Sequence, residues 1–315
     1  MNEPIFLTPS FQERIWGGTK LKSIYQYDIP SAQTGECWAI SGHENGESTV
    51  ISGEYSGEKL SDLWENHPEL FGFYHSEKFP LLIKILDANY DLSVQVHPDD
   101  FFAKSLESDE LGKTECWYII DCEEDAEIVF GHHAQTKTEL VTMIENNQWD
   151  DLLHRVKVHP GDFFYVPSGT VHAIGKGTLV LETQQSSDTT YRVYDYNRTG
   201  PDGERRELHL EKAVAVATVP HITKKVEPKI CRVDEATITT FVEDQYFSVH
   251  KWEVHNRIEL VQDQPFMLVS VLEGNGTIQV NHKAYPIKKG QHFILPYRME
   301  NFILNGFMSL IVSHP

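Results

Sequence analysis

No stretch of the sequence is apolar for long enough to cross a bilayer. The run Leu81–Leu86 is interrupted by Lys84, whereas a spanning helix needs about 20 predominantly apolar residues. The first residues also lack the basic start and the apolar segment of a secretion signal. The four cysteines form no CxxC pair, which is typical of free thiols in a reducing compartment. We therefore expect a cytoplasmic protein with no membrane partner.

Positive charge is scarce. The chain has 27 lysines and arginines against 47 aspartates and glutamates, which gives a net charge of −20. This balance argues against nucleic acid as a partner, because phosphate backbones attract basic proteins. An anionic small molecule could bind only where the few cations converge, so a site for such a ligand must concentrate lysines and arginines.

Strand patterns dominate the chain. Short β-branched and aromatic stretches alternate with Gly, Pro, Asn and Asp between residues 81 and 194 and again between residues 247 and 312. Helical patterns are fewer, and we expect helices over residues 59–70, 138–156 and 210–217. Two series of strands with a few helical insertions predict a mainly β protein made of two cupin-like jelly-roll units.

The texture of the sequence changes between Pro220 and Pro228, where prolines and lysines replace the strand patterns. We therefore predict two domains, a catalytic unit over residues 1–225 and a C-terminal jelly roll over residues 226–315. The boundary is placed with an error of about ten residues, since boundaries are the least certain part of such a prediction.

A short repeat links the two units. Gly161–Pro167 and Gly290–Pro296 share a glycine, five residues and a proline, as expected where a glycine turn opens a strand that proline closes. Eleven residues after its glycine, the first copy reaches His172, whereas the second reaches Asn301. The C-terminal unit is therefore predicted to lack metal ligands.

The strand leading to His97 has a polar face. Ser93, Gln95 and His97 alternate with valines and a leucine, so strand geometry sends all three to one side. Taken alone, this face also fits a solvent-exposed strand. Glu115 from the next strand and His172 complete a set of two imidazoles, one carboxylate and one amide. Such a set suits zinc, although iron or manganese accepts the same ligands.

Several motifs together carry a family resemblance. The run from Gly161 through Pro167 and Gly169 to His172 resembles the second motif of the cupin superfamily. A wider set resembles the short bacterial form of class I mannose-6-phosphate isomerases: Arg14-Ile-Trp16-Gly17-Gly18, Gly35-Glu36-x-Trp38, Gln95-x-His97-Pro98-Asp99, Lys113-Thr114-Glu115, His172-Ala173 and Tyr191-Arg192. The resemblance covers about residues 10 to 200, and it implies reversible isomerisation of mannose 6-phosphate and fructose 6-phosphate.

The resemblance also implies roles for particular residues. One zinc ion per chain would be held by His97, Glu115, His172 and Gln95, of which Gln95 could instead bind a metal-bound water. Arg192 matches the arginine that the family treats as catalytic. The remaining matches fall on pocket positions: Lys84, Ser93, Lys113 and Glu182.

Chemistry supports a sugar phosphate as the small-molecule ligand. Lys84 interrupts an apolar strand, Lys113 flanks a proposed metal ligand, and Arg192 lies on a further strand, so three cations converge near the metal. We expect the two lysines and the Ser93 hydroxyl to contact the phosphate, and Arg192 to lie nearer the sugar oxygens and the enediolate.

The isomerisation needs a general base. Glu182 is the leading candidate, and a metal-adjacent histidine, a bound water or Asp188 are the alternatives.

Two other functions fit parts of the pattern. Iron-dependent cupin dioxygenases use the same barrel for oxygen chemistry, but an apolar substrate would not need three cations. A non-catalytic sugar-phosphate-binding regulator would not need an intact metal set. The oligomeric state is left open.

Overall fold

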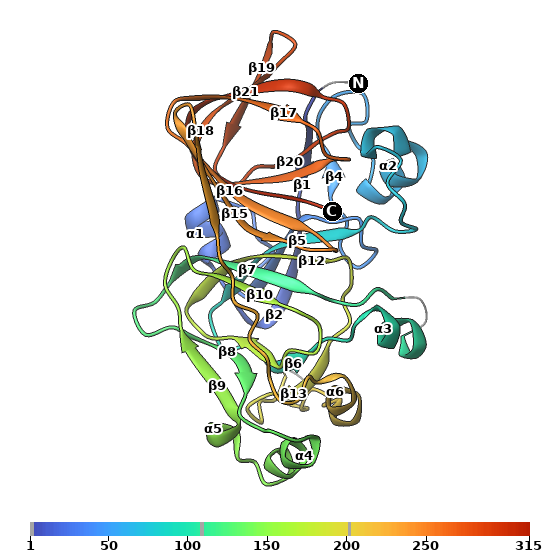
Figure 1. Cartoon of the computed structure of the whole chain (residues 1–315), viewed down its shortest axis with the longest axis vertical. Coiled ribbons are helices and arrows are strands. Elements are labelled where there is room, and N and C mark those ends of the chain that lie inside the picture. The colour runs from blue at the N-terminus through green and yellow to red at the C-terminus, as the bar shows by residue number, and fades with distance from the viewer. Residues whose placement is uncertain (1–2, 108–109, 201–202) are drawn as a thin grey trace.

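Three antiparallel sheets make up most of the computed structural model, which describes residues 3–107, 110–200 and 203–315 (Figure 1). Two of them, called sheet 1 and sheet 2 below, pack face to face in the lower half of Figure 1. The third, called sheet 3, forms the upper half. The mainly β, cupin-type fold predicted from the sequence is confirmed.

The strands of the two lower sheets come entirely from the N-terminal two thirds of the chain. In spatial order, sheet 1 contains β10 (Phe163–Val166), β7 (Glu115–Cys122), β12 (Thr178–Gln185), β5 (Leu81–Ala88), β3 (Thr34–Ile40) and β2 (Ser10–Gly18). Sheet 2 contains β13 (Tyr191–Tyr194), β6 (Val94–Val96), β11 (His172–Ile174), β8 (Glu127–His132) and β9 (Leu153–Lys157).

Sheet 3 draws strands from both ends of the chain. It contains β14 (Lys229–Val233), β15 (Ala236–Glu243), β16 (Ser248–Val254), β17 (Arg257–Gln262), β18 (Met267–Val280), β19 (Lys283–Lys288), β20 (His292–Leu295), β21 (Glu300–His314), β1 (Ile5–Thr8) and β4 (Thr49–Val50). β1 pairs with β20 and β4 pairs with β1, so N-terminal residues extend the C-terminal sheet. The division into residues 1–225 and 226–315 therefore remains a prediction about function rather than about strand pairing.

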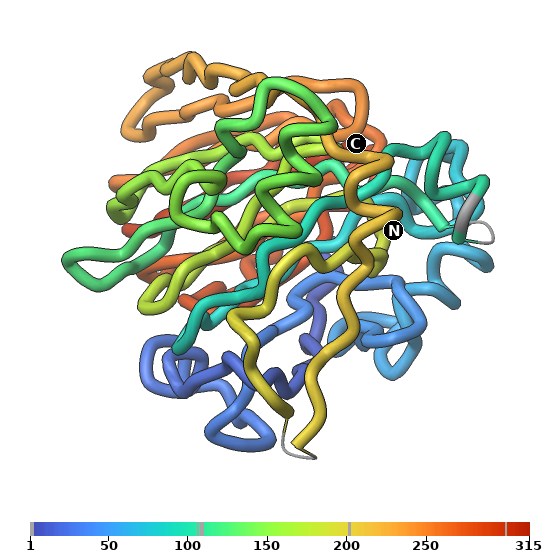
Figure 2. The backbone as a smooth tube through the Cα atoms, turned by 90° about the horizontal axis from the view of Figure 1, so that it is seen from below, coloured from blue at the N-terminus to red at the C-terminus, as the bar shows by residue number. Residues whose placement is uncertain are grey.

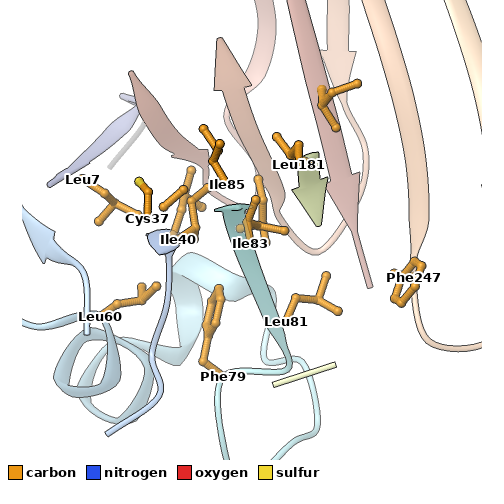
Figure 3. Packing of buried hydrophobic residues seen from close by; sticks show 14 of the residues in the cluster. Leu7, Cys37, Ile40, Leu60, Phe79, Leu81, Ile83, Ile85, Leu181 and Phe247 are labelled. Carbon is orange, nitrogen blue, oxygen red and sulfur yellow. The ribbon is translucent and has the colours of Figure 1, made fainter. Parts of the chain in front are cut away.

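The central strands of sheet 1, β5 and β12, are buried on both faces. Every residue of β5 and β12 is buried. One face packs against sheet 2, and Ile83, Ile85 and Leu181 on the other face pack against residues of sheet 3 and its surroundings (Figure 3). Phe247, just before β16, belongs to the same apolar cluster as these side chains. This shared core joins the two halves of the molecule.

The helices are short and cover the edges of the sheets. They are α1 (Lys20–Tyr25), α2 (Leu60–Asn66), the 3-10 helix η1 (Pro68–Phe71), α3 (Asp100–Leu106), α4 (Lys137–Glu145), α5 (Trp149–Leu152) and α6 (Leu210–Val216). The helix expected over residues 138–156 is wrong at its end, because Leu153–Lys157 pairs with β8 as a strand. Within the described ranges, we find no helix long and apolar enough to span a membrane.

The glycine-to-proline repeat marks equivalent strands. Gly161 and Gly290 both have positive φ, at 96° and 84°, and each precedes a four-residue strand, β10 and β20 respectively. A residue with a Cβ is strained at such a φ, so glycine is needed where each strand begins.

A buried histidine joins the N-terminal segment to sheet 3. The Tyr27 hydroxyl donates to the Gly290 carbonyl at 2.8 Å, so it accepts from His292 Nε2 at 2.7 Å. The Ser270 hydroxyl lies 2.9 Å from His292 Nδ1. Burial lowers the pKa of His292 to about 3, which keeps the ring neutral at ordinary pH.

We predict a pH dependence of stability from this histidine. Below a pH of about 6.5 the unfolded chain takes up a proton at His292 that the folded chain does not, so folding loses about 1.4 kcal/mol per pH unit as the pH falls towards 3. When the pH falls from 7 to 5, the free energy of unfolding measured in urea should decrease by about 2 kcal/mol less in His292→Asn than in the parent. The exposed His255→Asn variant controls for loss of a histidine as such. Equal losses in the parent and His292→Asn would contradict the prediction.

Candidate functional site

Two rows of side chains face each other between sheets 1 and 2. On sheet 1, cross-strand pairing aligns Trp38, Lys84, Glu182 and Trp117. On sheet 2, it aligns Arg192, Gln95 and His172 opposite the first row. All of these except Trp38 line one cavity of about 340 Å³. Strands far apart in sequence thereby bring the predicted residues to one place.

Three of the four predicted metal ligands form a compact buried cluster. Ligand atoms of His97, Glu115 and His172 all lie within 4.8 Å of one another. Each Glu115 oxygen lies 3.4 Å from one imidazole: Oε1 from His172 Nε2 and Oε2 from His97 Nε2. Within the described ranges, no other group of three or more histidine, cysteine or carboxylate side chains is arranged in this way.

The two imidazoles are held in the tautomer that a metal requires. His97 Nδ1 lies 2.8 Å from the Thr189 carbonyl and His172 Nδ1 lies 2.8 Å from the Thr170 carbonyl, so both Nδ1 atoms donate. Burial lowers the pKa of His97 well below its ordinary value and that of His172 to about 4. Both rings are therefore neutral, and each directs its Nε2 lone pair to the centre of the cluster, where Lys113 Nζ lies 3.1 Å from His97 Nε2.

Glu115 supplies the observation that tests whether a metal fits. Its side chain is 1% exposed, and neither oxygen has a hydrogen-bond donor with acceptable geometry. Lys113 Nζ approaches Oε2 to 2.9 Å as an ion pair and leaves Oε1 without a partner. A buried carboxylate is costly unless it is paired or coordinated, so the donor set fits a divalent metal.

Gln95 reaches the same centre. Its Nε2 lies 3.5 Å from His97 Nε2 and 3.4 Å from His172 Nε2. The two atoms of an amide group are assigned from their surroundings, and the reversed amide presents Oε1 to the cluster instead. Gln95 therefore reaches the cluster through its amide group, and only the reversed amide would offer an oxygen ligand to a metal there.

The loop before β11 fixes the position of His172. Gly169 has a φ of 82°, which glycine adopts without strain, and its N–H donates to the His97 carbonyl at 2.9 Å. A Cβ on Gly169 would lie 2.5 Å from the Thr218 hydroxyl. The proline-glycine turn thus ties the two histidine segments together by a backbone hydrogen bond.

Lys84 lies among carboxylates on the sheet 1 side of the cavity. Its Nζ is 3.8 Å from Glu36, 3.9 Å from Glu182 and 4.0 Å from Asp188. It also lies 4.5 Å from the centre of the Trp38 ring, whose indole N–H donates to Glu36. The lysine that interrupts an apolar strand is buried with partners, as such a residue must be.

Glu182 has the environment of a proton-transfer group. Burial and then the negative charge of Glu115 raise its pKa, while Lys113 and Lys84 oppose this rise. The indole N–H of Trp117 donates to Glu182 Oε1 at 3.1 Å and holds the carboxylate in place. A raised pKa brings a carboxylate closer to the range in which it both accepts and returns a proton.

Arg192 lies on the sheet 2 side of the cavity, and no carboxylate within residues 3–107, 110–200 and 203–315 contacts it directly. Its Nε donates to the buried Ser93 hydroxyl at 3.3 Å, and its Nη1 donates to the Glu207 carbonyl at 2.8 Å. Both residues line the cavity, and their roles towards substrate remain predictions.

Several other residues that line the cavity are assigned no role from the sequence alone. Arg14 and Glu36 stand in the quoted motifs, and the structure joins them through two hydrogen bonds at 2.8 and 3.2 Å. Arg206 also lines the cavity, although it stands in a polar segment without a strand pattern. No local signal distinguishes it from its neighbour Arg205.

Comparison with known proteins identifies the family. Two family models match: phosphomannose isomerase type I, catalytic domain, over residues 5–131, and mannose-6-phosphate isomerase, cupin domain, over residues 237–315. A mannose-6-phosphate isomerase of Bacillus subtilis is 56% identical over 312 residues, 99% of each chain. The chain belongs to the type I phosphomannose isomerase family.

Other members of this family agree over the whole length. The mannose-6-phosphate isomerase of Streptococcus mutans is 49% identical over 314 residues, which cover 100% of this chain and 99% of that one. A crystal structure of the mannose 6-phosphate isomerase from Bacillus subtilis superposes with a TM-score of 0.98 at 55% identity over 99% of both chains. The family resemblance seen in the sequence motifs is confirmed.

The cluster makes a prediction about metal content. His172→Ala removes one of two imidazole ligands and should lose both bound metal and turnover, because Glu115 and His97 alone hold a divalent ion weakly. Arg192→Ala should keep the metal of the parent and lose most turnover. Elemental analysis of gel-filtered proteins measures the metal per chain. A His172→Ala protein with full metal and activity would remove His172 from the ligand set.

Proposed function

We infer that this chain interconverts mannose 6-phosphate and fructose 6-phosphate at the buried cluster described above. The observation that carries this function is Glu115, a buried carboxylate between two neutral imidazoles whose Oε1 has no hydrogen-bond donor. It lies in a cavity lined by cations in a chain of the type I phosphomannose isomerase family. These features favour the isomerase over a cupin dioxygenase or a non-catalytic regulator.

Zinc is the proposed metal, one ion per chain, held by His97, Glu115, His172 and Gln95. Two imidazoles and one carboxylate form a set that zinc accepts in catalytic sites, where a position stays open for substrate. When bound, zinc would act as a Lewis acid towards the sugar oxygens at C1 and C2. The remaining chemistry falls to side chains of this chain.

The reaction moves one hydrogen between two carbons. A base takes the proton from C2 of the open-chain aldose, the C–H electron pair becomes the C1–C2 double bond, and the carbonyl electrons pass to O1. Return of that proton to C1, with transfer of the O2 proton to O1 as the C2 carbonyl forms, gives the ketose. Atoms balance, and no oxidant or reductant is required.

We propose Glu182 as this base. Its raised pKa suits a group that takes a proton and then returns it, and the Trp117 indole fixes its direction. Asp188 is more exposed, at 38% of its side chain, and lies beside Lys84 on the solvent side.

The cations stabilise negative charge that develops on the sugar oxygens. Arg192 is proposed to face the enediolate, since its guanidinium has neutral partners and keeps its full charge for the substrate. Lys84, Lys113 and Ser93 are proposed as further substrate-binding residues, because all three are buried in the wall of the cavity.

Glu182→Gln tests the base. The amide keeps the size of the side chain but accepts no proton, so kcat should fall by about 100- to 10,000-fold while metal content is unchanged. The exposed Glu124→Gln variant is the matched control and should retain the kcat of the parent. A coupled assay of fructose 6-phosphate formation measures both. If Glu182→Gln keeps kcat within threefold of the parent, another group removes the proton.

A further inference from the structure

The charged residues of the cavity separate into groups with different net charge. In one group, buried carboxylates balance the charge of the cations. In the other, the cations outnumber the carboxylates. A phosphate carries close to two negative charges at neutral pH, so it binds most strongly where positive charge is unbalanced.

Both buried lysines lie beside carboxylates, and a divalent metal at the cluster would add positive charge beside Lys113. Lys113 lies 2.9 Å from Glu115, which balances it. Lys84 shares its surroundings with Arg14, and these two cations face three carboxylates, those of Glu36, Glu182 and Asp188. Even with Glu182 protonated, the second group is neutral overall.

The opposite side of the cavity has the reverse balance. Asp195 is buried and is shared by two arginines, since Arg206 donates to it at 2.8 and 2.6 Å and Arg198 contacts the same Oδ1. Arg192 adds a third guanidinium, bonded only to neutral oxygens. Among the residues that the structure describes, three cations thus share one buried carboxylate. The nearby Glu207 carboxylate is 84% exposed, so water screens it.

The protonation behaviour agrees with this surplus. Burial opposes the negative charge of Asp195, but Arg206 and Arg198 outweigh it and hold the pKa of Asp195 below its ordinary value. Burial and then Arg206 lower the pKa of Arg192. Like charges therefore act on Arg192, as expected in an unbalanced positive field.

The two lysines and Arg206 also differ in how deeply they are buried. The side chains of Lys84 and Lys113 are 4% and 5% exposed, whereas that of Arg206 is 25% exposed and still lines the cavity. In an open-chain sugar 6-phosphate, the phosphate is at the opposite end from C1 and C2. With C1 and C2 at the buried cluster, the phosphate points to the mouth, where a dianion also loses least hydration.

Arg206 lies in a segment that doubles back on itself. Residues 195–200 and 203–209 run side by side, with Thr199 and Arg205 paired as an antiparallel bridge, and Figure 2 shows them in yellow extending from the body. Asp195 holds Arg206 through Nε and Nη2, which leaves Nη1 for another partner. Arg198 instead donates to the Asp91 carbonyl and does not line the cavity.

We propose that Arg206, positioned by Asp195, binds the substrate phosphate and selects phosphorylated sugars. Arg192 and Ser93 lie beside it, and Lys84 and Lys113 serve the sugar oxygens instead of the phosphate. This inference rests on the proposed isomerase function and replaces the expectation that the two lysines contact the phosphate.

Arg206→Gln tests the proposal against Arg205→Gln, since the two neighbours carry equal charge and Arg205 is exposed. In Arg206→Gln, KM for mannose 6-phosphate should rise about 10- to 100-fold, the range for a lost charge-assisted contact, with kcat within threefold of the parent. The inhibition constant of inorganic phosphate should rise by a similar factor. Arg205→Gln should match the parent in all three quantities. KM and phosphate inhibition within twofold of the parent in Arg206→Gln would overturn the proposal.

Asp195→Asn tests the positioning role. Made in the parent, this substitution should raise KM at least threefold. Made in Arg206→Gln, it should raise KM no further, because the effect of Asp195 passes through Arg206. A merely structural role would lower activity equally in both backgrounds, and that outcome would refute the positioning role.

Calorimetric binding of inorganic phosphate to the parent and to Arg206→Gln gives a readout independent of turnover. If the parent binds phosphate but does not isomerise mannose 6-phosphate, the proposed function fails. If the parent isomerises and Arg206→Gln binds phosphate as well as the parent does, only the phosphate assignment fails.

Discussion

The buried carboxylate of Glu115 is the constraint on which the site depends. It begins β7, a strand with sheet 3 on one side and the cavity on the other, and it has no hydrogen-bond donor of its own. Its charge is balanced by Lys113 and by whatever the two imidazoles hold. Both histidines are kept neutral by burial, and carbonyl partners at Nδ1 direct their Nε2 atoms towards Glu115.

The geometry of the two sheets places the other groups of the site around Glu115. Sheet 1 carries the carboxylates and lysines, sheet 2 carries Gln95, His172 and Arg192, and the cross-strand rows place the two sets opposite each other. The resulting cavity runs from the buried His97, Glu115 and His172 cluster to the more exposed Arg206. We propose that this order orients the sugar, with its reacting carbons inside and its phosphate outside. The core shared with sheet 3 keeps the outer face of sheet 1 dry and rigid (Figure 3).

The sequence predicts this site better than it predicts the surrounding fold. Period-two alternation sends Ser93, Gln95 and His97 to one face in any strand, and the glycine turn before His172 is also a local feature. The pairing of β1 with β20 is invisible in the sequence, because no local pattern reports which distant strand becomes a neighbour. The strand Leu153–Lys157 resembles the end of a helix for the same reason, since its pairing with β8 decides its conformation. Arg206 escapes prediction because its buried partner Asp195 is brought to it by tertiary structure.

Titration of metal into metal-free protein, with turnover of mannose 6-phosphate followed at each addition, tests the central claim most directly. The account predicts that turnover rises in proportion to bound zinc and reaches its limit at one ion per chain. Full turnover by protein freed of all metal, or no turnover by protein with one ion bound at His97, Glu115 and His172, would contradict it.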